Sequence, residues 1–74
     1  MTIQEAREMF KPATAVEVEL LGECTIIAQS HDLRLADVLG DAVKFWSGPG
    51  RSIHPRRWKA RAEAARRLLA RASV

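Results

Sequence analysis

The sequence is poor in the residues that usually carry catalysis. It contains no tyrosine and no asparagine, two histidines (His31 and His54) and a single cysteine, Cys24. A cysteine nucleophile needs a histidine within hydrogen-bond reach and a third group that orients the histidine. On a helix, the seven positions from Cys24 to His31 would span about 10 Å. We therefore predict a protein without enzymatic activity, in which Cys24 is a buried thiol.

The possible metal ligands are scattered along the chain. Zinc sites typically contain two cysteines or histidines a few residues apart, and Cys24, His31 and His54 form no such pair. The glycines of segment 48–52 precede a helical pattern, but they lack the spacing of a nucleotide-binding phosphate loop. We expect neither a metal nor a cofactor.

The scarcity of cysteine and of long apolar runs bears on localisation. One cysteine allows no disulfide within the chain, which fits a reducing compartment. The longest uncharged stretch, 24–31, falls short of the roughly 20 residues that a membrane span needs, and the N-terminal residues lack the pattern of a signal peptide. Nine arginines against three lysines, with twelve alanines, suggest GC-rich coding. We expect a cytoplasmic protein of a bacterial host cell, of the kind that phages and plasmids carry.

The length of the chain limits its stability. With 74 residues there is room for one domain, residues 1–74. Such a chain buries only about 60% of its unfolded surface, and it gains stability by covering an apolar face with a partner. We therefore expect self-association, as a homodimer.

Charge is divided sharply along the chain. Residues 1–50 carry eight acidic and four basic side chains, whereas residues 51–74 carry eight basic side chains and one acidic side chain, Glu63. A basic segment of this kind favours an anionic partner: an acidic protein, a nucleic acid or a membrane surface. The acidic half of the same chain is another possible partner for it.

Apolar residues at helical spacing predict three helices, over residues 3–10, 33–46 and 55–72. Thr2 and Glu5 have the spacing of a capping box at the first helix, and Asp32 is a suitable N-cap for the second. Pro55 suits the first position of the last helix. The segment 47–50 contains two glycines and a proline, so it should separate two antiparallel helices.

The last helix shows two further features. His54 is its expected cap, with Ile53 and Trp58 placed as a hydrophobic staple around it. One face should form an apolar seam, made by residues Trp58, Ala62, Ala65, Leu69 and Ala72.

The segment 15–29 allows two interpretations. Thr14 and Glu17 form a second capping pattern, and Val16, Leu20, Cys24 and Ile27 share one helical face, which favours a helix. Val16 to Leu20 also alternates between apolar and acidic residues. Gly22 would then turn the chain into a second strand, so a hairpin within an α+β fold is the alternative.

We favour an all-α bundle of four helices, over residues 3–10, 15–29, 33–46 and 55–72. Its expected core consists of Phe10, Leu20, Ile27, Leu35, Leu39, Val43, Trp46, Trp58, Leu68 and Leu69.

The basic C-terminal helix is the most informative functional feature. Tryptophan and arginine, which are enriched in protein–protein hot spots, both occur in it. We therefore expect a small regulatory or accessory protein that binds an acidic surface of a protein partner. The expected partner-binding residues are Arg56, Arg57, Lys59, Arg66, Arg67 and Arg71.

Two alternatives remain at this stage. The basic residues would also form an ordinary solvated helix face, or they would neutralise DNA phosphates in a transcriptional regulator. If residues 24–29 formed a strand, the order strand, helix, glycine-containing loop and helix would resemble that of ribbon-helix-helix dimers. Thr25, Ile27 and Gln29 would then face the DNA groove.

Overall fold

The computed structural model describes residues 2–48 and 55–72, and these form an all-α globule of four helices. The helices are α1 (Ile3–Phe10), α2 (Ala15–Ser30), α3 (Leu35–Ser47) and α4 (Pro55–Ala72). No strand occurs in either described segment. The predicted fold class is confirmed, and the expected helix boundaries agree with the observed ones to within two residues.

Residues 15–30 form one continuous helix, so the hairpin alternative is wrong. The ribbon-helix-helix resemblance fails with it, because Cys24 and Gln29 lie within α2 rather than on a strand. The helix is favoured over the hairpin because it buries Leu20, Leu21 and Cys24 together against other helices. An alternating strand would have turned Leu20 and Leu21 to opposite faces.

The starts of the helices follow the capping chemistry only in part. The Thr2–Glu5 capping box is complete, with the Glu5 amide bonded to Oγ1 of Thr2 at 3.1 Å and the Glu5 side chain accepting from the Thr2 amide. Asp32 is not the N-cap of α3, because this helix begins later and Arg34 occupies the cap position. Asp32 instead has a left-handed φ of 52°, which suits the tight turn between α2 and α3. The proposed cap and staple at His54 and Ile53 lie outside the described residues.

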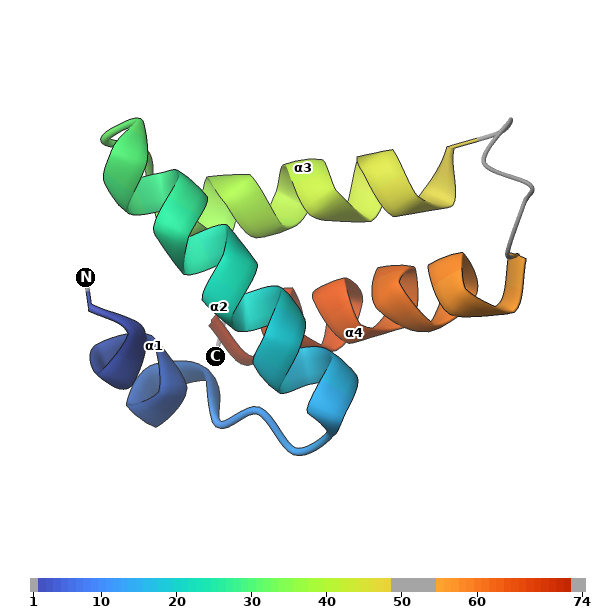
Figure 1. The fold of residues 1–74 in the computed structure, drawn as a ribbon, viewed down its shortest axis with the longest axis horizontal. Helices are drawn as coiled ribbons and strands as arrows, with labels where there is room; N and C mark the ends of the chain where they lie inside the picture. Colours follow the sequence, from blue (N-terminus) through green and yellow to red (C-terminus); the bar gives the residue numbers. More distant parts are fainter. Residues whose placement is uncertain (1, 49–54, 73–74) are drawn as a thin grey trace.

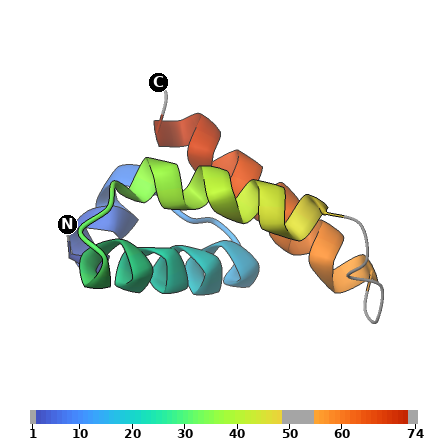
Figure 2. The same cartoon turned by 90° about the horizontal axis from the view of Figure 1, so that it is seen from above.

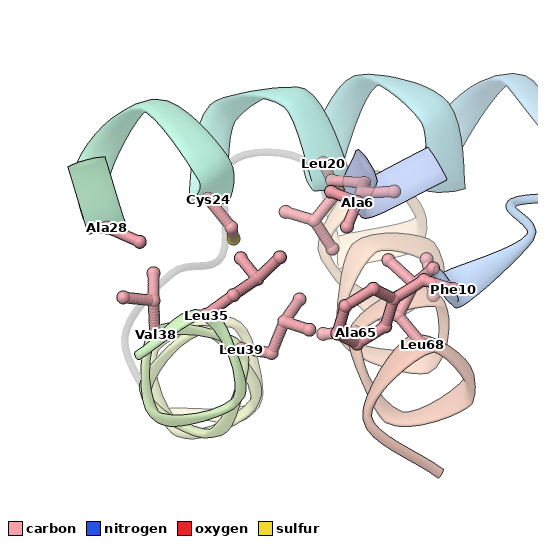
Figure 3. Packing of buried hydrophobic residues seen from close by; sticks show 12 residues of the cluster. Ala6, Phe10, Leu20, Cys24, Ala28, Leu35, Val38, Leu39, Ala65 and Leu68 are labelled. Atoms are coloured by element: carbon pink, nitrogen blue, oxygen red, sulfur yellow. The ribbon is translucent and has the colours of Figure 1, made fainter. Parts of the chain in front are cut away.

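The arrangement of the helices places α3 and α4 side by side, running in opposite directions (Figures 1 and 2). Helix α2 crosses them at an angle, and α1 packs against α2 and against α4 near the end of α4 (Figure 1). All four helices contribute to one apolar core, whose residues point toward one another in Figure 3. The core consists of Ala6, Phe10, Leu20, Leu21, Cys24, Ala28, Leu35, Val38, Leu39, Ala64, Ala65 and Leu68.

Half of the expected core is buried as predicted. Five of the ten expected residues are buried, and Val43 and Leu69 are partly buried against the core. Ile27 is 46% exposed, and Trp46 and Trp58 are only half-buried, so these three assignments are wrong. The positions of α4 that face the core carry mainly small residues, Ala64 and Ala65 among them, and the ring that fills the core comes from Phe10 of α1.

Candidate functional site

The basic side chains of α4 divide into two groups. Arg56, Arg57 and Lys59, at its start, are exposed. Arg66 is also exposed, and it donates a hydrogen bond to Oγ of Ser47 at 2.8 Å. The other two predicted partner-binding residues, Arg67 and Arg71, contact the acidic half of the same chain. The predicted basic surface is therefore concentrated on four residues, with its greatest density near the start of the helix.

Glu17 is the acidic group that Arg67 and Arg71 contact. Its side chain is 1% exposed, although it is a carboxylate at the start of α2. Arg71 pairs with Oε1, Nε of Arg67 lies 3.5 Å from Oε2, and the Thr14 hydroxyl donates to Oε2 at 3.0 Å. Burial alone would raise the pKa of Glu17. The hydrogen bonds from Arg71 and Thr14, the charge of Arg71 and the Ala13 amide together hold this pKa below its ordinary value of 4.5.

Arg71 also ties the end of α4 to the connection between α1 and α2. Its Nη1 donates to the carbonyl oxygen of Lys11 at 3.1 Å, where α1 ends and the backbone has a left-handed φ of 47°. Carbonyls at the end of a helix lack partners within the helix, so a cationic donor is favourable there. Arg71 is therefore part of the fold's own polar framework.

Arg61 is a buried residue that the sequence analysis missed. It is 8% exposed, and its guanidinium pairs with Glu19 at 3.3 Å and with Glu23. It also stacks over the Trp46 ring, 4.6 Å from the centroid. Its Nε is buried and has no hydrogen-bond acceptor within the described parts of the chain. Its position three residues after Trp58 and four before Ala65 was the available signal, since that spacing puts it on the apolar face.

An apolar groove lies above Arg61, between α2 and α3. Helices α2 and α3 leave their connecting turn at an angle to each other, as Figure 1 shows, and the groove between them has a volume of about 390 Å³. Two acidic groups, Glu23 on α2 and Asp41 on α3, border it. Its lining is otherwise almost entirely apolar, made by Leu20, Cys24, Ile27, Val38, Ala42, Phe45 and Trp46.

A second hollow continues the groove toward the start of α4. Its volume is about 370 Å³, and it shares Glu23, Trp46 and Arg61 with the first. Glu19, Arg57 and Trp58 complete its lining. The exposed basic start of α4 therefore adjoins the apolar groove, which the sequence alone did not indicate.

Three aromatic rings gather along this surface. Phe45 and Trp46 meet edge to face with their centroids 4.9 Å apart, and Trp46 and Trp58 lie 6.5 Å apart at a tilt. Phe45 is 46% exposed, as is Ile27 across the groove. Aromatic residues and arginine are enriched at the centres of protein interfaces. The groove thus combines an apolar lining, aromatic rings and a charged border.

Catalytic and metal chemistry find no support in the described residues. The Cys24 thiol is buried, and burial together with the charge of Glu23 raises its pKa to about 11, against the opposing charge of Arg61. Such a thiol is protonated and unreactive at neutral pH. Residues 2–48 and 55–72 contain no group of three or more histidine, cysteine, aspartate or glutamate side chains arranged to hold a metal ion.

Comparison with known proteins gives no relative: no family model, curated protein or solved structure matches the chain. Within the described residues, every helix is too short or too polar to span a bilayer.

Proposed function

We propose that this chain is a small non-enzymatic protein-binding domain, of the regulatory or accessory type, whose interface is the groove between α2 and α3. The observation that carries the proposal is the aromatic surface formed by Phe45, Trp46 and Trp58 beside an apolar groove. Both tryptophans and one of the two phenylalanines of the chain lie on this surface.

The distribution of side-chain size supports this proposal. The interior is built largely from alanine and leucine, whereas the largest rings are half-buried or exposed around the groove. A short chain gains most of its stability from apolar burial, so leaving its largest apolar side chains in water forgoes much of the available stabilisation. A protein partner that covers these rings would add the stabilisation that comes from burying them.

The basic residues have a defined place in this proposal. Arg57 borders the hollow that continues the groove, and Arg56 and Lys59 are exposed on the same end of α4. The partner would insert an apolar side chain into the groove and place acidic groups against these three residues. Arg66 extends the basic surface further along α4, whereas Arg67 and Arg71 act mainly by holding α4 against α1 and α2 through Glu17.

Protein is a better candidate than DNA for the same surface. Glu23 and Asp41 border the groove, and Glu19 borders its continuation. Arg61 pairs with Glu19 and Glu23, so Asp41 is the carboxylate that would repel phosphates brought to this surface. A protein partner that fills the groove with apolar atoms makes use of the whole surface, whereas a nucleic acid would use only its basic end.

The test compares capture of protein partners from lysates of the producing cells by three forms of the chain. These are the wild type, Phe45→Glu and the matched control Met9→Glu, which places the same charge at an exposed position on α1. We expect the wild type and the control to retain the same proteins, and Phe45→Glu to lose them. Equal capture by all three forms would show that the groove is not the interface.

A second measurement addresses the DNA alternative. We expect no binding of random duplex DNA at physiological salt. Binding that weakens at least about tenfold between 50 and 200 mM salt would instead indicate several phosphate contacts and would contradict the proposed assignment.

A further inference from the structure

We propose that the partner in the groove is a second copy of this chain, related to the first by a two-fold axis. This inference rests on the proposed function, since it names the protein that occupies the same groove. It assigns the aromatic surface around Phe45 and Trp46 as a self-association interface.

The charges around the groove favour a partner that carries both signs. Asp41 borders it on α3 and Arg57 borders its continuation on α4, whereas Glu19 and Glu23 on α2 are paired with Arg61. A uniformly acidic partner would meet repulsion at Asp41, and a uniformly basic one would meet repulsion at Arg57. A second copy carries the acidic and the basic side within one surface.

Two-fold symmetry converts this mixed surface into a complementary one. In an isologous dimer the same patch is used by both chains, so every favourable contact occurs twice. Rotating one copy by half a turn over the groove turns its basic side toward the acidic side of the other. The apolar groove then lies at the centre of the interface and the charged groups at its rim, the usual anatomy of protein interfaces.

The apolar residues around the groove supply the central contact. Ile27 and Phe45 are each 46% exposed, on opposite walls of the groove. Homodimer interfaces are more apolar than transient ones, and a chain of 74 residues profits from such additional burial.

The first test is sedimentation equilibrium of the purified full chain. We expect the wild type to reach twice its mass of 8.3 kDa at about 100 µM, a concentration at which micromolar affinity is readily detected. Phe45→Glu should weaken the dimer at least about 30-fold, because a charge would replace a ring at the centre of the interface. Met9→Glu should leave the mass unchanged. Ile27→Lys provides a second disruptive variant from the opposite wall, and far-UV circular dichroism verifies that each variant is folded.

The second test reverses the charge at Arg57 or at Asp41 to examine charge complementarity across the interface. Arg57→Glu and Asp41→Lys should each weaken self-association, because each places side chains of the same sign at positions 41 and 57, which the two-fold axis brings together. An equimolar mixture of the two variants should form a heterodimer more tightly than either variant forms a homodimer, since the mixture restores opposite signs across the interface. No increase in mass on mixing would overturn the two-fold arrangement.

The outcomes separate this inference from the proposed function. A wild-type chain that remains monomeric at about 100 µM, or a dimer that survives both Phe45→Glu and Ile27→Lys, overturns the second copy as the occupant. The protein-binding function itself fails only if Phe45→Glu also leaves the capture of other proteins unchanged.

Discussion

Replacing Arg71 by alanine should destabilise the fold through Glu17. The side chain of Glu17 is 1% exposed, and Arg71 is the main cation that pairs with it. Removing one partner of a buried ion pair costs about 3–5 kcal/mol when the remaining charge is left without compensation. Nε of Arg67 remains 3.5 Å away and the Thr14 hydroxyl still donates. We therefore expect a smaller loss, of about 2 kcal/mol.

The loss of stability caused by Arg71→Ala should become smaller as the pH falls. Because the folded-state pKa of Glu17 is lowered below 4.5, ionised Glu17 contributes stability above that pH, and the contribution disappears as the pH falls through the folded pKa. Without Arg71 the burial of Glu17 remains, so its pKa should rise. The stability difference between wild type and Arg71→Ala should be complete at neutral pH and should shrink below pH 4.5.

The assay is urea unfolding followed by far-UV circular dichroism, at neutral pH and at acidic pH. In a thermal scan of the same signal, a loss of about 2 kcal/mol would lower the Tm by roughly 8–16 °C. The matched control is Arg66→Ala on the same helix, whose exposed side chain donates a hydrogen bond to Ser47, with an expected loss within about 0.5 kcal/mol. Equal stability of the two variants, or a difference that does not change with pH, would refute this account of Glu17.

Further expected outcomes concern the core, a helix cap and the buried thiol. Leu39→Ala, at a site with 0% exposure, should lose about 3 kcal/mol in urea unfolding, whereas Leu33→Ala, at an exposed site, should stay within about 0.5 kcal/mol; similar values would contradict the core assignment. Thr14→Ala should lose at least about 1 kcal/mol in the same assay, because the Thr14 hydroxyl caps α2 and also donates to Glu17. At neutral pH, Cys24 should react with a thiol reagent about 100-fold more slowly in the folded chain than in denaturant, since its pKa is raised from 9.0 to about 11; equal rates would show an accessible thiolate.

The helices were predictable because their signals are local. The Thr2–Glu5 capping box and Pro55 act within a few residues of each helix start, and both helices begin where these residues indicate. The end of α1 was equally local, since Lys11 precedes a proline and leaves the helix. Asp32 was not predictable in this way. Its side chain is suited to an N-cap, but the residue lies in the turn between α2 and α3 with a left-handed φ.

The candidate site was less predictable because it depends on how the helices pack. Arg61 was not singled out, because burial of an arginine requires acceptors from another helix, and Glu19 and Glu23 are about forty positions away in sequence. The same applies to Arg67 and Arg71, which were expected to face a partner and instead contact Glu17. The division of charge along the chain suggested that the basic segment could pair with the acidic half of the same chain. Helical periodicity does not indicate which arginines form those pairs.

The groove itself arises from a rotation of the helices that the sequence did not specify. Trp58 and Leu69 were expected to anchor the two ends of the α4 seam, but both are only partly buried, whereas Ala64 and Leu68 are buried beside Ala62 and Ala65 of that seam. The buried face of α4 is therefore rotated by part of the roughly 100° that separates neighbouring residues on a helix. That rotation leaves Trp58 at the edge of the core, close to Trp46, where the two rings border the groove.

Site-specific photo-crosslinking in the producing cells tests most directly whether the groove between α2 and α3 is a protein interface. A photoreactive phenylalanine analogue is placed at Phe45 beside the groove, or at the exposed control position Met9 on α1. We expect a discrete protein adduct from position 45 and no adduct of comparable yield from position 9. If the partner is a second copy, the adduct should have twice the mass of the chain. Equal adduct yields from the two positions, or no adduct from position 45, would contradict the assignment of this groove as a protein interface.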